Sequence, residues 1–167
     1  RPVKIGVLGD QSSAYSDPGG KGSVVAAQMA IDDFGKSVLG KPIELVSADH
    51  QNKPEIAANI ARRWYDRDGV DMITDLTNSA VALAVQEVTK EKKRINLVTS
   101  TATTALTNEA CSPYGVHWTF DAYAPSLGGY GPVGVSALLS LTLEAERHGL
   151  DPLVLAAGLL AVATSTV

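Results

Sequence analysis

The sequence has few cysteines and few charged residues, and both features limit the classes of function that the protein can have. Among its 167 residues Cys111 is the one cysteine, so no disulfide forms within the chain and cysteine usage indicates no redox compartment. Charged residues make up 19% and the net charge is -4, which offers nucleic acid no basic surface. The densest basic cluster, residues 90–94, falls where a helix is expected to end and cations favour its dipole. We expect no nucleic-acid partner.

Long apolar runs are also missing. The most apolar stretch, residues 153–167, is shorter than the roughly 20 residues that a membrane-spanning helix needs, so we expect it to form a buried strand or helix. The chain enters an apolar strand at Val3, which indicates that any signal peptide has been removed or never existed. With 45% hydrophobic residues, the composition is that of an ordinary globular domain.

Short apolar runs alternate with helical patterns along most of the chain. Helices are expected from Ser23 to Gly35, from Asn52, which with Glu55 has the spacing of a capping box, and from residues 77–79. Such alternation predicts an α/β fold: a three-layer, flavodoxin-like parallel sheet with helices on both faces. Ligands bind these sheets beyond the carboxyl ends of the strands. The predicted strands are residues 3–8, 43–48, 70–76, 95–98 and 116–120.

Composition changes after Tyr123, where charged residues become sparse. We therefore divide the chain into a lobe at 1–122, a Gly- and Pro-rich hinge or linker at 123–132, and a last segment at 133–167. That last segment is expected to hold a helix at about 133–148 and a strand at about 153–157.

Hydroxyl side chains follow two neighbouring strands, in residues 77–79 and again in 99–104. Backbone N–H groups at the start of the third helix, its positive dipole end, and these hydroxyls together suit a carboxylate without any Lys or Arg. Asn78 and Ser79 stand at the centre of this pattern. A helix cap followed by a turn explains the same residues equally well, so the pattern alone leaves both interpretations open.

Three segments resemble a known family. They read VKIGVLGDQSSAYSDPGGKGSVVAAQMAIDDF, then IELVSADHQNKPEIAANIARRWYDRDGVDMITDLTNSAVALAVQEV, then INLVTSTATTALTN. They are similar to the first lobe of the Leu/Ile/Val-binding family, the type I periplasmic solute receptors of ABC transporters, over residues 3 to about 122. The resemblance implies that Ser79, then Thr101 or Ala102, and Thr103 hold the carboxylate and amino groups of the ligand.

An aromatic residue in the first loop of that family touches the ligand side chain. Tyr15 is the nearest candidate here, although the usual position holds Pro18. Family members are about twice as long and enclose the ligand between two lobes. The segment GYGPVGVSALLSLTLEAERHGLDP is similar to the helix that returns to complete the first lobe.

The resemblance implies an extracytoplasmic, periplasmic solute-binding domain of an ABC importer. It captures an amino acid or a small carboxylate, aromatic ones included, and has an ABC permease as its partner. We expect no catalytic residue, no metal and no cofactor. Because a single lobe offers one wall of contacts, we expect weak binding and a homodimer that covers the exposed wall.

Two other classes of function compete with this one. The first alternative is a ligand-sensing regulatory domain of the same lobe family, whose ligand alters a partner protein. The second is an enzyme on a flavodoxin-like sheet. Residues 19–23 approach a phosphate loop, but Gly22 breaks the required spacing. Asp10 and Asp49 suit acid and base chemistry, although Asp at a strand end more often caps a turn. Cys111 lies in no catalytic motif, and the histidines lack metal-ligand spacing: His50, His117 and His148.

Overall fold

The computed structural model describes residues 1–119 and 121–122. The chain divides into two units, Arg1–Phe120 and Asp121–Val167, and the fold below is that of the first. The predicted linker at 123–132 and the predicted helix and strand within 133–167 lie outside the described residues and stay predictions. Within the described residues, no helix is both long and apolar enough to cross a membrane.

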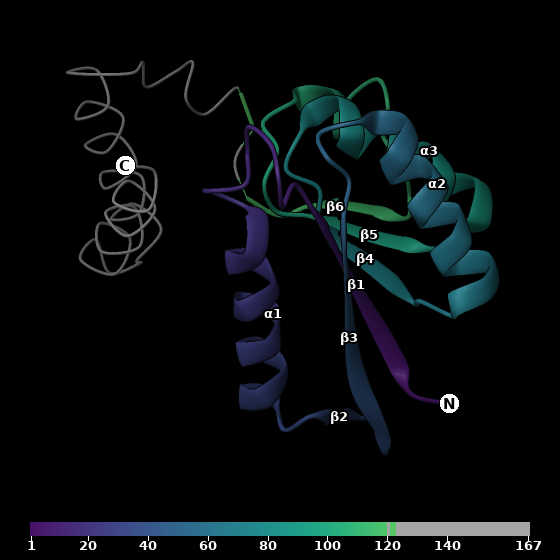
Figure 1. Ribbon diagram of the computed structural model, residues 1–167. Coiled ribbons are helices and arrows are strands. Elements are labelled where there is room, and N and C mark those ends of the chain that lie inside the picture. The colour runs from purple at the N-terminus through teal and green to yellow at the C-terminus, as the bar shows by residue number, and fades with distance from the viewer. Residues whose placement is uncertain (120, 123–167) are drawn as a thin grey trace, which may run out of the picture. The chain divides into compact units, whose positions relative to one another are not determined.

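A six-stranded sheet in the order β2-β3-β1-β4-β5-β6 forms the middle of this unit (Figure 1). All neighbours from β3 to β6 are parallel, which confirms the predicted architecture. At the edge, β2 runs antiparallel to β3 and was not predicted. Leu39 and Gly40 join them with φ values of 51° and 73°, as a two-residue hairpin turn requires. The strands are β1 (Val3–Gly9), β2 (Ser37–Val38), β3 (Lys41–Asp49), β4 (Met72–Asp75), β5 (Ile95–Val98) and β6 (Gly115–His117).

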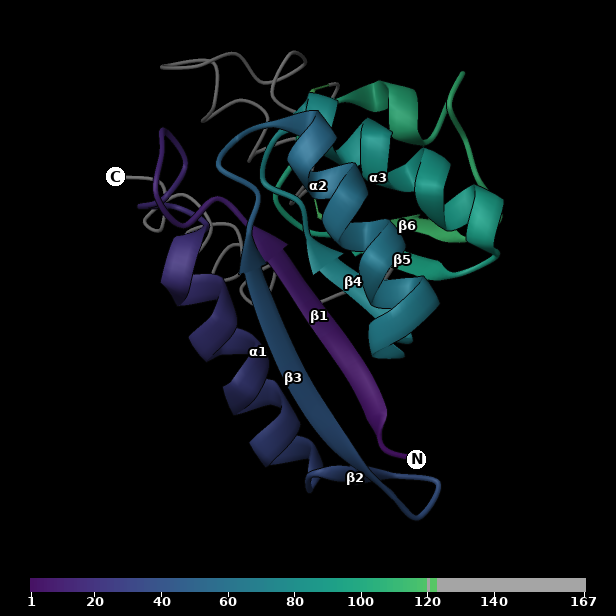
Figure 2. The same ribbon diagram turned by 45° about the vertical axis from the view of Figure 1, so that its right-hand side comes forward.

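Helices cover both faces of the sheet (Figure 2). On one face lies α1 (Gly20–Phe34), which packs against β1 and β3. On the other lie α2 (Pro54–Arg63) and α3 (Ser79–Lys92), which pack against each other. A π-helical turn, Trp64–Asp68, prolongs α2, and a 3-10 turn, Thr104–Leu106, follows β5.

One predicted helix end agrees with the structure and one does not. As predicted, α1 ends at Gly35, whose φ of 99° is a left-handed cap conformation. Asn52 does not cap α2, so that prediction was wrong. Lys53 holds the cap position without a side-chain bond, and Pro54 supplies the fixed φ of the first turn. Asn52 itself has a φ of 55° and bonds to Asn78, far along the chain.

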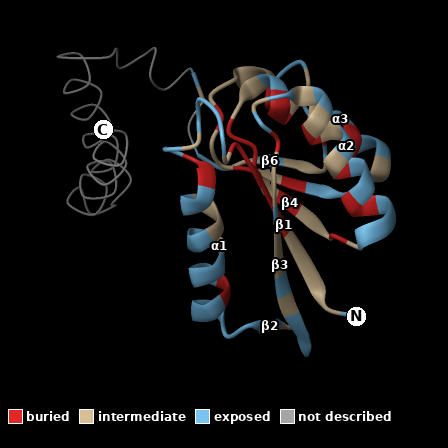
Figure 3. Ribbon diagram, viewed as in Figure 1, coloured by how far each residue is buried: buried red, intermediate tan, exposed pale blue. Residues whose placement is uncertain are grey.

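The main core lies between the sheet and the α2/α3 layer, where buried residues gather (Figure 3). Leu8, Ile73 and Val98 point into it from three neighbouring strands. From the helices it receives Ala57, Ala61, Trp64, Val81, Val85 and Val88. Packing on this face is close enough that the Trp64 ring occupies the space above Gly6, which has no side chain to obstruct it.

The opposite face of the sheet carries an apolar groove of about 470 Å³ beside α1. Thr74 is its one residue with a polar side chain, so the groove suits an apolar neighbour and not a carboxylate. Phe34, which lines it, is exposed, as are Ile95 and Val116, which pair with the lining residues Met72 and Leu97. The groove is lined by Val3, Ile5, Ala27, Ala30, Ile31, Phe34, Val38, Ile43, Met72, Thr74 and Leu97.

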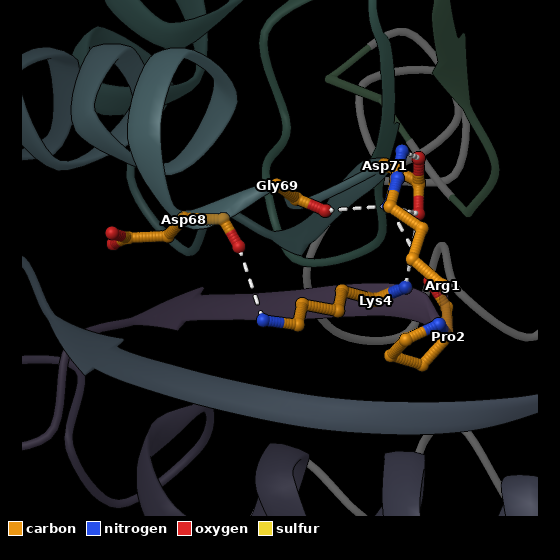
Figure 4. A network of polar contacts seen from close by, with 6 residues as sticks. All are labelled: Arg1, Pro2, Lys4, Asp68, Gly69 and Asp71. Carbon is orange, nitrogen blue, oxygen red and sulfur yellow. Dashed lines mark hydrogen bonds and ion pairs between the residues drawn. The ribbon is translucent and has the colours of Figure 1, made fainter.

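A polar network fastens the N-terminus to the loop before β4 (Figure 4). Arg1 donates two hydrogen bonds to the Asp71 carboxylate, at 2.9 and 2.6 Å, and one to the Gly69 carbonyl at 3.0 Å. The backbone N–H of Lys4 also donates to Asp71, at 3.0 Å, and its ammonium donates to the Asp68 carbonyl at 3.1 Å. Because the Arg1–Asp71 pair is solvent-exposed, we expect it to contribute little to stability.

We predict opposite outcomes for two glycines changed to alanine. Gly6→Ala places a methyl group closer to a carbon of the Trp64 ring than two carbon atoms can approach, which is a steric clash, and should lower the free energy of unfolding by about 1–3 kcal/mol. Gly22→Ala meets no atom within 4 Å and removes a glycine from a helix, so it should leave stability unchanged or raise it by about 0.5–1 kcal/mol. Urea unfolding followed by circular dichroism measures both. Equal stabilities would contradict the packing described here.

Candidate functional site

Parallel pairing brings the carboxyl ends of β1, β3, β4 and β5 to one edge of the sheet. Polar residues lie at or just after the ends of these strands, and several are buried: Asp10, His50, Asp75, Thr77 and Thr101. This strand-end edge therefore holds most of the polar side chains that sequence analysis marked as candidates. Their bonds show which of them are free to bind a ligand.

Asp10 organises the loop that follows β1. Its carboxylate accepts from the backbone N–H groups of Ser13 and Tyr15, both at 2.9 Å, and from the Ser13 hydroxyl. Burial on its own raises the pKa of Asp10, but the bonds from Ser13, Tyr15 and Ser12 outweigh it and lower the pKa below its ordinary value. This ionised carboxylate is a turn cap, with no free oxygen for acid and base chemistry.

Asp49 plays the same part after β3. It accepts from the backbone N–H groups of Gln11 at 3.0 Å and Gln51 at 2.7 Å, and from the Ser12 hydroxyl. Burial opposes ionisation, yet these bonds keep the pKa of Asp49 below its ordinary value. The two aspartates therefore shape adjacent loops, in agreement with the turn interpretation of their position.

A chain of polar contacts runs from β3 to the start of α3. The fully buried His50 accepts from the backbone N–H of Asn52 at its Nδ1, 3.0 Å away, and burial lowers the pKa of this histidine despite nearby Asp10 and Asp49. The Oδ1 of Asn52 accepts from the Nδ2 of Asn78 at 2.7 Å. Asn78 is thus oriented by a residue from a different strand end.

Asn78 caps α3 through its Oδ1, which accepts from the N–H groups of Ala80 at 2.7 Å and Val81 at 3.3 Å. Sequence analysis expected several free N–H groups here, and the cap occupies two of them. The N–H of Ser79 has no partner among the described residues. The anion-binding potential of this helix start is therefore concentrated at Ser79.

The structure brings Ser79 together with the segment after β5. Its hydroxyl oxygen lies 3.1 Å from that of Thr101, which is buried. Ala102 follows directly, and the Thr103 hydroxyl accepts from the N–H of Ala105, so it caps the 3-10 turn while its own hydrogen stays available to donate. No hydrogen bond joins the partly exposed Tyr15 side chain to this group within the described residues.

Asp75 is a member of this edge that sequence analysis missed. It is 2% exposed, and its Oδ1 accepts from the Ser100 hydroxyl at 2.7 Å, whereas its Oδ2 has no partner. Burial raises the pKa of Asp75, and the neighbouring hydroxyls of Ser100, Ser23 and Thr77 only partly offset the effect. The sequence signal was present, because a carboxyl group ends a short strand that begins with Met72 and Ile73.

The backbone around Asp75 is strained. Asp75 and Leu76 have φ values of 85° and 63°, which non-glycine residues seldom adopt and which concentrate at functional sites. Glycines allow the chain to close over this turn. A side chain at Gly9 would meet the Asp75 carboxyl at 2.5 Å, and one at Gly19 would meet the buried Thr77 hydroxyl at 2.7 Å.

The remaining candidates do not form a site. The N–H groups of Gly19 and Gly20 donate to the carbonyls of Tyr15 and Ser16, so the glycine-rich segment does not present them to a phosphate. Cys111 is exposed. Residues 1–119 and 121–122 contain no group of three His, Cys, Asp or Glu side chains able to hold a metal ion.

Comparison with known proteins identifies the family and the fold. The family model for periplasmic binding proteins matches residues 2–133. A periplasmic binding protein from Burkholderia mallei is similar at 48% identity and a TM-score of 0.75, over 76% of this chain and 34% of that one. A branched-chain amino acid ABC transporter ligand-binding protein from Burkholderia xenovorans LB400 is 43% identical, with a TM-score of 0.75, over 83% and 36%.

A third solved structure is a solute-binding protein of an ABC transporter from Rhodopseudomonas palustris BisB5, in complex with 3,4-dihydroxybenzoic acid. It is 25% identical with a TM-score of 0.68, over 74% of this chain and 33% of that one. Among curated proteins none matches. Together with these matches, the doubly covered parallel sheet identifies the fold as that of a type I periplasmic binding protein lobe. The chain belongs to the periplasmic binding protein family, and it spans about a third of the length of these solved relatives.

We predict that Asp75→Asn removes a pH-dependent loss of stability. At low pH the Asp75 carboxyl is protonated in both the folded and the unfolded protein. As the pH rises above about 3.9, this carboxyl ionises in the unfolded protein, whereas burial keeps it protonated to higher pH in the folded protein. Stability attributable to Asp75 therefore falls with rising pH. Asparagine keeps an acceptor for Ser100 and carries no charge, so the variant should be more stable than the parent at pH 7 and differ little from it at pH 4. Urea unfolding at both pH values measures this, and an equal effect at the two would contradict it.

Proposed function

We propose that this chain is a ligand-binding lobe of the periplasmic solute receptor of an ABC importer, and that it binds a small carboxylate without catalysing a reaction. The observation that carries the proposal is the contact between Ser79, at the start of α3, and Thr101, after β5, whose hydroxyl oxygens lie 3.1 Å apart. The ligand-binding residues are Ser79, Thr101, Ala102 and Thr103.

The physical case rests on donors without formal charge. A carboxylate near Ser79 meets an unpaired N–H, a hydroxyl and the positive end of the α3 dipole. Asn78 supports this arrangement indirectly, because its side chain is engaged in capping α3 and in the bond to Asn52. Hydroxyl and peptide N–H groups are less strongly hydrated than the ammonium group of a lysine, so the ligand displaces less tightly bound water from them.

The ligand class is inferred from two similar proteins and from the polar groups at the site. The relative from Burkholderia xenovorans is named for branched-chain amino acids, and the one from Rhodopseudomonas palustris holds 3,4-dihydroxybenzoic acid. Both are carboxylates. Within the described residues the carboxylates of Asp10 and Asp49 are occupied by loop donors. With these carboxylates occupied, the ammonium group of an amino acid would have to donate to hydroxyl or backbone carbonyl oxygens, such as those of residues 101–103, whereas an aromatic acid needs no such acceptor.

We predict that Ser79→Ala weakens carboxylate binding. Losing a hydrogen bond to a charged group costs about 1.5–3 kcal/mol, which corresponds to roughly 10- to 150-fold in affinity. Leucine and 3,4-dihydroxybenzoate are the probes, titrated calorimetrically into the parent and the variant. Ser37→Ala, an exposed position on the edge strand β2, is the matched control and should bind as the parent does. Unchanged affinity in Ser79→Ala removes Ser79 from the site.

We also predict that this chain binds its ligand more weakly than a receptor of full length. A binding site between two lobes surrounds the ligand, while one lobe leaves its polar groups in contact with water. A second copy can cover the same surface, so association into a homodimer is the expected compensation. Sedimentation velocity at several concentrations, with and without ligand, measures both effects. A strict monomer with submicromolar affinity would refute the argument.

A further inference from the structure

The loop that carries Thr101 is held by one side chain at the end of β6 and one just after it. Backbone pairing between β5 and β6 ends near Val98, whose carbonyl accepts from the Trp118 N–H at 2.9 Å. Beyond that point two side chains continue the connection. The hydroxyl of Thr119 donates to the Thr99 carbonyl at 2.8 Å, and Nε2 of His117 lies 2.7 Å from the Thr101 carbonyl.

The chemistry of the second contact fixes the tautomer. A carbonyl oxygen only accepts, so Nε2 of His117 carries the hydrogen that is shared with Thr101. His117 is partly buried at the end of β6, next to β5 in the sheet (Figure 1). It therefore acts on the loop from the side opposite β4.

Peptide geometry carries the effect of His117 to the next residue. The peptide bond is planar and trans, so the Ala102 N–H points opposite to the Thr101 carbonyl. With that carbonyl directed at β6, the N–H is directed away from β6, and β4 and the start of α3 lie on that side. Among the described residues the Ala102 N–H has no hydrogen-bond acceptor.

We propose that His117 is a positioning residue of the ligand site, which holds the peptide between Thr101 and Ala102 with its N–H turned toward the ligand carboxylate. This inference rests on the proposed function. The loop is fastened from the β4 side as well, because Asp75 accepts from the Ser100 hydroxyl and its carbonyl accepts from the Thr99 N–H at 3.2 Å. A loop held from both neighbouring strands is ordered before the ligand arrives, so binding does not bear that entropic cost.

Two substitutions separate the donor from the bulk of the side chain. His117→Leu fills similar space without a donor, and His117→Gln restores an amide N–H at a comparable distance from the backbone. The control is Tyr65→Phe, which removes a side-chain bond of 3.0 Å to the carbonyl of Ile95, at the end of β5 far from Thr101. Each variant is titrated with leucine and 3,4-dihydroxybenzoate, and its melting temperature is measured in parallel.

We expect His117→Leu to weaken binding of the recognised probe on the order of tenfold, and His117→Gln to stay within about threefold of the parent. Tyr65→Phe should lower the melting temperature and leave affinity unchanged. The inference is overturned if His117→Leu binds like the parent, if glutamine fails to restore affinity, or if Tyr65→Phe weakens binding equally. If the unsubstituted protein binds neither probe, the proposed function is refuted, and this outcome is distinct from the three that refute the role of His117.

Discussion

Parallel strand pairing is the constraint on which the rest of this lobe depends. Because β3, β1, β4, β5 and β6 pair in parallel with their neighbours in that order, all five strands end at the same edge of the sheet. Backbone and side-chain polar groups gather there, where the ladder of hydrogen bonds stops. They satisfy one another across the loops, as Asp10 does for the loop after β1 and Asn78 does for α3.

Some buried polar atoms at this edge have no hydrogen-bond partner among the described residues. Buried polar atoms without a partner are costly, so each one needs a reason. At the strand-end edge they include Oδ2 of Asp75, Oγ1 of Thr77 and Nε2 of His50. Two of these lie beside the strained turn after β4. The edge therefore combines strain with unsatisfied polarity, as binding sites commonly do.

The sequence predicted those elements correctly whose position depends on residues close to them in the chain. The strand Ile95–Val98 matches its prediction because charged and hydroxyl residues bound a short apolar run, and the end of α1 matches because a glycine was needed at positive φ. The meeting of Ser79 with Thr101 followed from strand order, since residues after adjacent parallel strands lie side by side.

Contacts between distant segments were not readable from spacing. Asn52 has the composition of a helix cap, yet it bonds to Asn78 from another strand end, and Pro54 makes a side-chain cap unnecessary. The hairpin at β2 is too short for any periodicity to reveal. Asp75 and His117 act through partners 25 and 16 residues away, and only the assembled sheet brings these pairs together.

The unequal covering of the two sheet faces has a consequence for how the lobe opens. In α3 the buried residues are Val81, Ala82, Val85, Gln86, Val88 and Thr89, whereas in α1 they are Gly20 and Ile31. Regions with few buried contacts open at lower free energy than the core does. Within the described residues, amide hydrogens of α1 should therefore exchange with solvent sooner than those of α3, so the lobe has a slowly exchanging half and a rapidly exchanging half on either side of one sheet.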